Sequence, residues 1–206
     1  MSSSAASTPI ELVFIDAGVP DLDRLLNGLQ EGMEAVLLTG DGDPVLQMRD
    51  ALAGRSGIDA IHIVAHGEAG SVDFLGGSLS AGTIEGYAEA LRDIGAALAA
   101  DGDILLWSCD TGQGSVGQAF VEALSRATSA DVAASDDLTG AAFLGGDWLL
   151  ETTAGSVEAD SPLTAAAAAD YDQVLIPTKT TLLFKAGPGR VDGNALYTSD
   201  VVVGGY

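Results

Sequence analysis

The stretch IHIVAHGEAG, residues 61–70, decides the fold of this chain. Four of its first five residues are apolar, and His66 and Gly67 end the run. A nearly continuous apolar run of this length is typical of a central parallel strand that is buried on both faces. The sequence therefore predicts an α/β domain in which one buried strand, residues 58–65, ends on a histidine.

A second stretch, LLWSCDTGQGSVG at residues 105–117, repeats this pattern and contains Cys109, the single cysteine of the chain. The carboxyl ends of parallel strands meet at one edge of a sheet, where ligands of open α/β sheets bind. If strand 103–108 is the neighbour of strand 58–65, the imidazole of His66 and the thiol of Cys109 overhang the same edge.

Strands and helices are predicted to alternate along most of the chain. The predicted strands are residues 11–18, 33–40, 58–65, 103–108 and 131–135, and helices are predicted within 19–32, 41–55, 83–100 and 115–127. Hairpins are predicted at 70–80, around Gly76 and Gly77, and at 141–151, around Gly145 and Gly146. This order predicts a mostly parallel sheet flanked by helices.

Three segments are expected from the changes in composition along the chain. Residues 1–9 form a small polar arm, and residues 10–157 form the α/β domain. Residues 158–206 are interpreted as a linker and C-terminal tail, or as the start of a following β-rich segment.

The charge balance excludes several classes of partner. The chain has 30 acidic and 8 basic residues, a formal net charge of −22. A nucleic-acid binder needs a basic face, so no nucleic-acid partner is expected. The chain has no run of eighteen apolar residues, so no membrane insertion is expected, and its first ten residues do not resemble a secretory signal peptide.

A cysteine and a histidine at neighbouring strand ends are a candidate nucleophile and base. A catalytic cysteine needs a base to form the thiolate and amide donors for the developing oxyanion. His66 is the candidate base, and the backbone amides of Gly67 and Cys109 are candidate oxyanion donors. Taken alone, a cysteine is more often a buried core residue and a histidine a satisfied polar residue. His62, inside the same strand, is interpreted as structural.

A competing motif overlaps the cysteine stretch. Gly112, Gly114 and Gly117 match the dinucleotide-binding pattern G-x-G-x-x-G, and Asp136 follows at the distance of a ribose-binding acid. Residues 108–111 intervene between the predicted strand and the first of these glycines, which weakens the match. Dinucleotide binding is therefore kept as a lesser hypothesis.

Three short acidic clusters, at residues 41–43, 101–103 and 135–137, could bind calcium through their oxygen atoms. None has EF-hand spacing, and solvated turns or helix caps explain them better than calcium binding does. No cofactor is required by the sequence, and calcium is considered as a structural or activating ion.

The chain resembles a known family over residues 10–158. The stretches AIHIVAHGEAGSVDFLG, ILLWSCDTGQGSVGQAFVEALSRATSADVAASDDLTG and LGGDWLLETTAGSVEA are similar to an N-terminal domain of unknown function found on giant bacterial repeat adhesins. That domain in turn resembles the caspase-like cysteine peptidases of clan CD: caspases, gingipains, legumain and toxin autoprocessing domains. The resemblance implies a caspase-like (caspase-hemoglobinase) three-layer sandwich and a catalytic dyad of His66 and Cys109.

The resemblance leaves substrate selection open. In several of these peptidases a residue just after the first strand selects the substrate side chain on the amino side of the cleaved bond, the P1 side chain. Asp16 occupies that region here and would favour a basic P1 residue, unless it caps the following loop. Trp107 replaces an acid found in metacaspase-like members and would favour an apolar P1 residue.

The toxin resemblance implies self-cleavage, with the C-terminal segment as the nearest polypeptide substrate. The basic candidates for P1 are Lys179, Lys185 and Arg190, and the apolar candidates are Leu175, Leu182 and Leu183. The adhesin resemblance implies a secreted or cell-surface protein whose export signal lies C-terminally.

The sequence therefore predicts a cysteine endopeptidase that processes its own chain. The alternative is a non-catalytic structural or interaction module of an adhesin.

Overall fold

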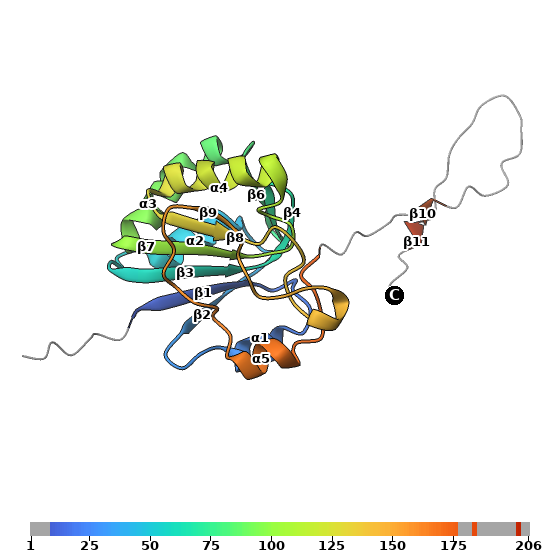
Figure 1. Ribbon diagram of the computed structural model, residues 1–206. Helices are drawn as coiled ribbons and strands as arrows, with labels where there is room; N and C mark the ends of the chain where they lie inside the picture. Colours follow the sequence, from blue (N-terminus) through green and yellow to red (C-terminus); the bar gives the residue numbers. More distant parts are fainter. Residues whose placement is uncertain (1–8, 177–182, 185–200, 203–206) are drawn as a thin grey trace, which may run out of the picture.

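The computed structural model describes residues 9–176, 183–184 and 201–202 (Figure 1). Its centre is a six-stranded sheet in the order β2-β1-β3-β7-β8-β9. The strands are β1 (Glu11–Asp16), β2 (Glu34–Leu38), β3 (Ile58–Val64), β7 (Leu98–Trp107), β8 (Asp131–Ala134) and β9 (Thr152–Ala154). All neighbours pair in parallel except β9, which is antiparallel to β8. The predicted α/β class with a mostly parallel sheet is confirmed.

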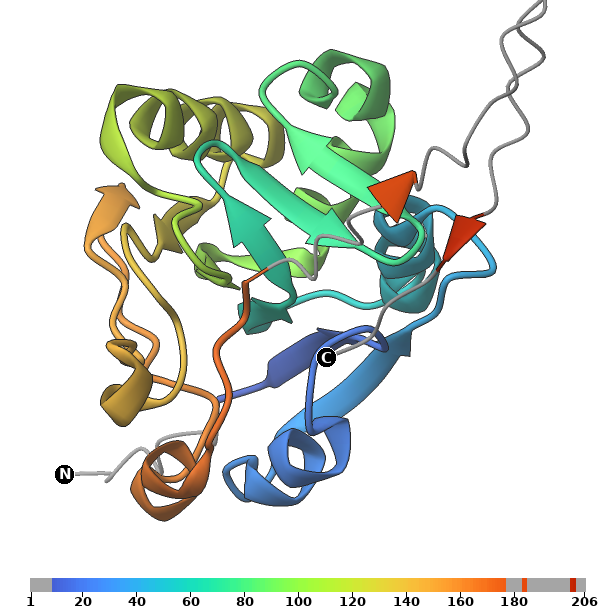
Figure 2. The ribbon, with the colours of Figure 1, turned by 90° about the vertical axis from the view of Figure 1, so that its right-hand side faces the viewer.

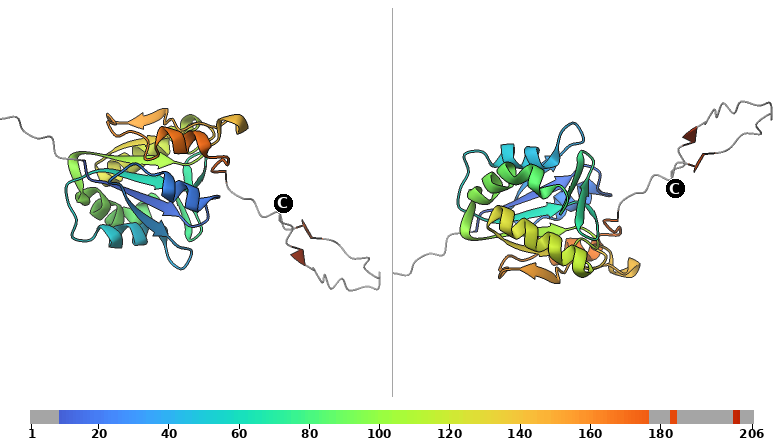
Figure 3. Two further views of the ribbon diagram at one scale, coloured as in Figure 1. Left: turned by 90° about the horizontal axis from the view of Figure 1, so that it is seen from below. Right: turned by 90° about the horizontal axis from the view of Figure 1, so that it is seen from above.

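Helices cover both faces of the sheet, so the domain has three layers. Helices α2 (Pro44–Leu52), α3 (Ala88–Ala97) and α4 (Gly114–Thr128) pack on one face, and α1 (Leu22–Gly28) and α5 (Ala165–Asp170) on the other. Figure 3 shows α1 and α5 side by side when the molecule is seen from below, and the other three helices from above. The short 3₁₀ helices are η1 (Ile84–Tyr87) and η2 (Ala142–Leu144).

Alternation along the two central strands assigns their side chains to opposite layers. Ile61 and Ile63 of β3 join the core beneath α2, α3 and α4. Val64 of β3 and Trp107 of β7 join the core beneath α1 and α5. Because successive side chains of a strand point to opposite faces, His62 also belongs to the α1–α5 side.

A small antiparallel sheet follows β3. It consists of β4 (His66–Glu68), β5 (Ser71–Phe74) and β6 (Gly77–Ser80). The hairpin predicted at 70–80 is confirmed, with Phe74 paired to Gly77 across the turn. Near the C-terminal end of the chain, β10 (Leu183–Phe184) pairs antiparallel with β11 (Val201–Val202).

The hairpin predicted at 141–151 is wrong. Residues 142–144 form η2, and Gly145 follows with a positive φ of 90°. The amides of Gly145 and Gly146 donate to the carbonyls of Ala142 and Ala141, which closes a helical turn. The two glycines thus end a 3₁₀ helix, a conformation that glycine adopts at the same low cost as a hairpin turn.

The domain does not end at residue 157. Residues 158–176, interpreted from sequence as the start of a linker, pack against the α1 side of the sheet, and Leu163, Tyr171 and Leu175 are buried there. The alanine-rich helix α5 fits closely against α1, because a Cβ added at Gly28 would lie 2.5 Å from that of Ala167. Small side chains without a clear apolar stripe gave no sign of this packing. The contacts of this segment with the rest of the domain continue as far as Leu175.

In the parts of the chain that the structure describes, no helix has the length and apolar character needed to cross a membrane.

Helix α3 packs tightly on the end of α4, which gives a test of the fold. A Cβ at Gly95 would collide with the carbonyl oxygen of Thr128, whereas a Cβ at Gly86 meets nothing within 4 Å. We expect Gly95→Ala to destabilise the domain by roughly 1–3 kcal/mol, the usual cost of overpacking. Thermal unfolding should show a melting temperature lower by several degrees for Gly95→Ala, and little change for the matched control Gly86→Ala. Equal melting temperatures would contradict this packing.

Candidate active site at the ends of β3 and β7

The two stretches singled out in the sequence are neighbours. Strands β3 and β7 pair in parallel up to Val64 and Trp107, and the amide of Ala65 donates to the carbonyl of Trp107 at 3.3 Å. Just beyond, a Cβ added at Gly67 would lie 2.7 Å from the carbonyl oxygen of Cys109. The backbones of the two predicted site segments are therefore in contact.

His66 and Cys109 follow the paired ends of the two strands. Each lies two residues beyond the last paired residues, Val64 and Trp107. Cys109 lies in the same apolar cluster as Val64 and Trp107, beneath α1 and α5. The structure thus brings the segments of the predicted base and nucleophile to neighbouring strand ends.

The hydrogen bond of His66 leaves one ring nitrogen unpaired. Its Nε2 lies 3.1 Å from the carbonyl oxygen of Gly18. A carbonyl can only accept, so Nε2 carries the proton and, in the neutral imidazole, Nδ1 is an acceptor. Nδ1 is buried and has no hydrogen-bond partner. A buried acceptor without a partner is what a base that receives a proton requires.

Asp16 holds the loop that positions His66. Its Oδ1 accepts from the amide of Gly18 at 2.9 Å, and its Oδ2 accepts from the amide of Leu75 at 3.0 Å. Asp16 is almost completely buried, so both carboxylate oxygens are occupied by backbone donors. The substrate-binding role considered for Asp16 does not fit this geometry, and the alternative, a loop cap, does.

Cys109 is completely buried and held by Thr139. The Sγ–H group donates to the carbonyl of Thr139 at 3.7 Å, and the amide of Thr139 donates to Sγ at 3.3 Å. Burial raises the pKa of the Cys109 thiol from 9.0 to about 11, although the amides of Thr139 and Leu175 act in the opposite direction. In this arrangement the group is a thiol at neutral pH and not a thiolate.

Gly67 is required by packing at this site. A side chain there would meet Thr111, Ser108 and the backbone of Cys109 at once. Glycine at this position therefore allows the ends of β3 and β7 to approach. The oxyanion role of the Gly67 and Cys109 amides stays a prediction.

The Trp107 side chain is buried in the apolar cluster beneath α1 and α5. Its indole Nε1 donates to Nδ1 of His62 at 3.2 Å, and Nε2 of His62 lies 2.9 Å from a carboxylate oxygen of Glu11. Both ring nitrogens of His62 are thus satisfied, as its structural interpretation requires. The Trp107 ring also packs against Trp148, with centroids 6.1 Å apart, at a pocket of about 440 Å³.

The sequence interpretation missed the segment that covers Cys109. Residues 173–175 run antiparallel to residues 139–141: the amide of Ala141 donates to the carbonyl of Gln173 at 2.8 Å, and the amide of Leu175 donates to that of Thr139 at 3.0 Å. Figure 2 shows this segment, in orange after α5, running beside the gold loop that contains Thr139. Its only sequence signal was the short apolar group at 174–176.

The glycines of the dinucleotide motif have packing roles. A Cβ at Gly117 would collide with the backbone of Gly112, and a Cβ at Gly112 would lie 2.7 Å from the side chain of Thr152. Gly114 opens α4 with a φ of 62°. These contacts account for all three glycines without a bound phosphate.

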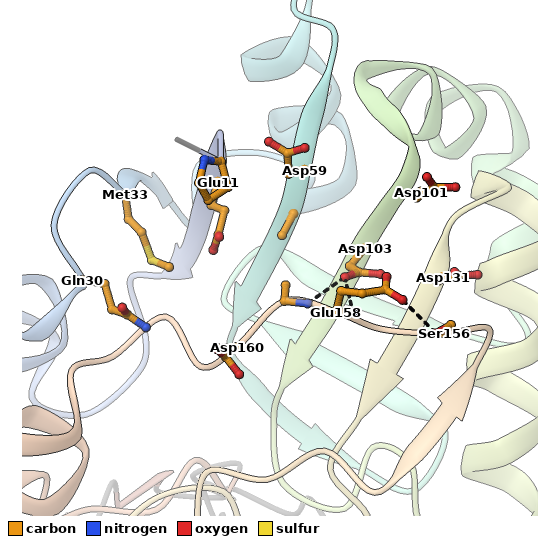
Figure 4. Close-up of a pocket in the computed structure, with 13 residues that line it drawn as sticks. Glu11, Gln30, Met33, Asp59, Asp101, Asp103, Asp131, Ser156, Glu158 and Asp160 are labelled. Atoms are coloured by element: carbon orange, nitrogen blue, oxygen red, sulfur yellow. Dashed lines mark hydrogen bonds between the residues drawn. The ribbon is translucent and has the colours of Figure 1, made fainter. Parts of the chain in front are cut away.

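The acidic clusters differ in their surroundings. Asp43 caps α2 by accepting from the amides of Val45 and Leu46, in agreement with the capping interpretation. The carboxylates of Asp137, Asp147 and Glu151 lie within 4.8 Å of one another. A third group surrounds a separate pocket of about 640 Å³, shown in Figure 4. Its acidic lining residues are Glu11, Asp59, Asp101, Asp103, Asp131, Glu158 and Asp160.

Asp103 is the buried member of this acidic pocket. Its Oδ2 accepts from the amides of Glu158 and Ala159 at 2.9 and 3.0 Å, whereas its Oδ1 is buried without a partner. Burial is the main cause that raises the pKa of Asp103, and the charges of Glu158 and Asp131 raise it further. No lysine, arginine or histidine is among the described residues that line the pocket.

Comparisons with known proteins identify a family but no activity. A family model described as a domain of unknown function, DUF4347, matches residues 12–175. No curated protein matches. A solved structure described as a small-chain dehydrogenase is 10% identical, over 59% of this chain and 77% of that chain, with a TM-score of 0.32. A similarity of that size carries no inference about activity.

The reactivity of Cys109 tests its burial. With the pKa raised from 9.0 to about 11, the folded protein holds about a hundredfold less thiolate at pH 8 than the unfolded chain. We therefore expect iodoacetamide to alkylate folded Cys109 at least a hundredfold more slowly at pH 8 than in denaturant. The rate in the folded protein should rise about tenfold per pH unit up to pH 11. Mass spectrometry measures both rates, and rapid alkylation of the folded protein at pH 8 would contradict the buried thiol.

Proposed function

This chain belongs to the DUF4347 family, and we propose that it is a caspase-like cysteine endopeptidase that processes the polypeptide of which it is part. One observation supports the proposal most. His66, with its unpartnered Nδ1, and Cys109 follow the paired ends of the neighbouring strands β3 and β7. A Cys-His dyad needs a base close to its nucleophile, so this arrangement supports the proposal.

The proposed reaction follows from these groups. The Cys109 thiol passes its proton to Nδ1 of His66, and Sγ attacks the carbonyl carbon of the peptide bond. The amides of Gly67 and Cys109 donate to the developing oxyanion. The carbon–nitrogen bond breaks, the new amine takes the proton from His66, and a thioester remains. Water then hydrolyses the thioester, which releases the carboxylate and restores the thiol.

The described conformation is the resting state of the proposed peptidase. Cys109 donates to Thr139 and not to His66, and its raised pKa keeps it protonated. Activation therefore requires the thiol to leave Thr139 and turn to Nδ1 of His66. Catalytic hydrogen bonds commonly tighten only when substrate is bound.

A non-catalytic module is the second candidate. The observation that favours it is the complete burial of Cys109 together with its high pKa, which suits an inert core cysteine. On this proposal the domain would serve as a structural or interaction module of a secreted or cell-surface adhesin. Its high negative charge suits an exported protein in a calcium-containing medium.

Calcium is proposed as a structural or activating ion of the acidic pocket. The unpartnered Oδ1 of Asp103 has further carboxylates beside it and no basic side chain among the described pocket residues. Carboxylate oxygens are the ligands that calcium prefers, and a bound cation would compensate the charge of Asp103. Asp103 fits as a ligand, with Glu158 and Asp131 as its nearest acidic neighbours by their effect on its pKa.

Intact mass spectrometry tests the peptidase. We expect the wild-type chain, incubated with and without calcium, to lose a C-terminal fragment. Cys109→Ala and His66→Ala should stay intact, because the first lacks the nucleophile and the second lacks the base. Cleavage that persists in Cys109→Ala would rule out Cys109 as the nucleophile of that cleavage. An intact wild-type chain under all conditions would favour the non-catalytic module.

Thermal unfolding tests the calcium site. We expect calcium to raise the melting temperature of the wild type and to have a much smaller effect on Asp103→Asn, whose amide oxygen still accepts from Glu158 and Ala159. The matched control is Asp43→Asn, a change of the same kind at a helix cap outside the pocket. Glu151→Gln tests in the same way whether calcium binds the separate carboxylate group of Asp137, Asp147 and Glu151. If calcium raised the melting temperature of Asp103→Asn as much as that of the wild type, the pocket would be excluded as the calcium site.

A further inference from the structure

We propose that residues 173–175 occupy the substrate groove of Cys109, and that this groove takes an extended peptide with a leucine-like residue beside the thiol. The inference rests on the proposed peptidase function and names its substrate: the segment that ends at Leu175, followed by Ile176.

The segment is bound as an added strand. The amide of Ala141 and the carbonyl of Thr139 both pair with it, around the antiparallel bridge between Gly140 and Val174. A Cβ at Gly140 would collide with the carbonyl oxygen of Gln173, and Gly140 has a φ of 133°. Glycine at this position therefore admits a second strand at close range. Backbone pairing of this kind is a general way in which proteins bind extended peptides.

Thr139 connects the bound segment to the nucleophile. Its carbonyl accepts from the amide of Leu175 and from the thiol of Cys109, and its own amide donates to Sγ. Leu175 and Cys109 thus share one acceptor. Leu175 and Cys109 also lie in the same apolar cluster. Leu175 is therefore the residue of the segment that lies at the thiol.

The pocket around Leu175 is apolar. Leu175 is completely buried in one cluster with Val19, Trp107, Cys109 and Tyr171. Asp16, the acid considered for recognition of a basic P1 residue, is already satisfied by two backbone amides. A lysine or arginine in place of Leu175 would have to bury its charge without a partner in this cluster. The surroundings therefore favour an apolar P1 residue, the preference considered for Trp107.

The bond after Leu175 lies where the chain leaves the groove. Leu175 is 0% exposed, and the next side chain, Ile176, is 48% exposed. Attack of Sγ on the Leu175 carbonyl carbon would form the thioester, break the bond to the nitrogen of Ile176 and leave that nitrogen as a new amine. Hydrolysis would give a chain that ends in the Leu175 carboxylate.

A charge at Leu175 tests whether the segment covers the thiol. Leu175→Asp cannot keep its carboxylate in the apolar cluster, so the segment should leave the groove. We expect alkylation of Cys109 by iodoacetamide at pH 8 to become at least tenfold faster than in the wild type. Ile176→Asp makes the same change at the exposed neighbour and should leave the rate within twofold. Leu91→Ala, in the opposite core, controls for general destabilisation.

The two measurements separate this inference from the peptidase itself. Equal alkylation rates in Leu175→Asp and Ile176→Asp would overturn the groove assignment, whatever the proteolytic result. Loss of residues 176–206 from the wild type, but not from Leu175→Asp, would support it. Cleavage at another bond, such as after Lys179, would overturn the leucine preference and leave the peptidase standing. Faster alkylation without any cleavage would support the groove and count against the peptidase.

Discussion

The register between β3 and β7 is the constraint on which the candidate site depends. Pairing of Val64 with Trp107 brings the segments of His66 and Cys109 together, each two residues farther along. Because side chains alternate along a strand, a shift of one residue in either strand would turn its side chains to the opposite layer. Gly67 allows the strand ends to meet, since any side chain there would strike Thr111 and the backbone of Cys109. The apolar side chains that fix the register of β3 and β7 therefore also fix the positions of the His66 and Cys109 segments.

The same layer that positions Cys109 also makes it unreactive. The cluster beneath α1 and α5 excludes water from the thiol, and Thr139 satisfies it on both sides. Desolvation disfavours the thiolate, so reaction with a reagent from solution would require the cover to move. The cover is made by the end of the domain itself, through Tyr171 and Leu175, with the Tyr171 hydroxyl donating to the carbonyl of Pro20. The segment that contains Tyr171 and Leu175 thus contributes to the burial and the raised pKa of the Cys109 thiol, and it is also the proposed substrate.

His66 depends on a chain of contacts that begins in β1. Asp16 at the end of that strand binds the amide of Gly18, and the carbonyl of Gly18 holds Nε2 of His66. Asp16 also binds the amide of Leu75 in the β5–β6 turn. One buried carboxylate thus fixes the loop, the hairpin and the orientation of the imidazole. The acidic pocket around Asp103 contains different carboxylates.

The sequence by itself determined the alternating architecture and the strand ends on which His66 and Cys109 lie, because apolar runs and the residues that stop them are local signals. It also indicated the structural role of His62 and the hairpin after β4. Only the tertiary structure decided that residues 158–176 complete the domain, that Asp16 supports a loop, and that Gly145 and Gly146 end a 3₁₀ helix. These outcomes depend on contacts between residues far apart in the chain, such as Thr139 with Leu175 and Gly28 with Ala167. An alanine-rich helix and a short apolar strand bury little surface on their own, so their place is set by the partners they meet and not by their own pattern.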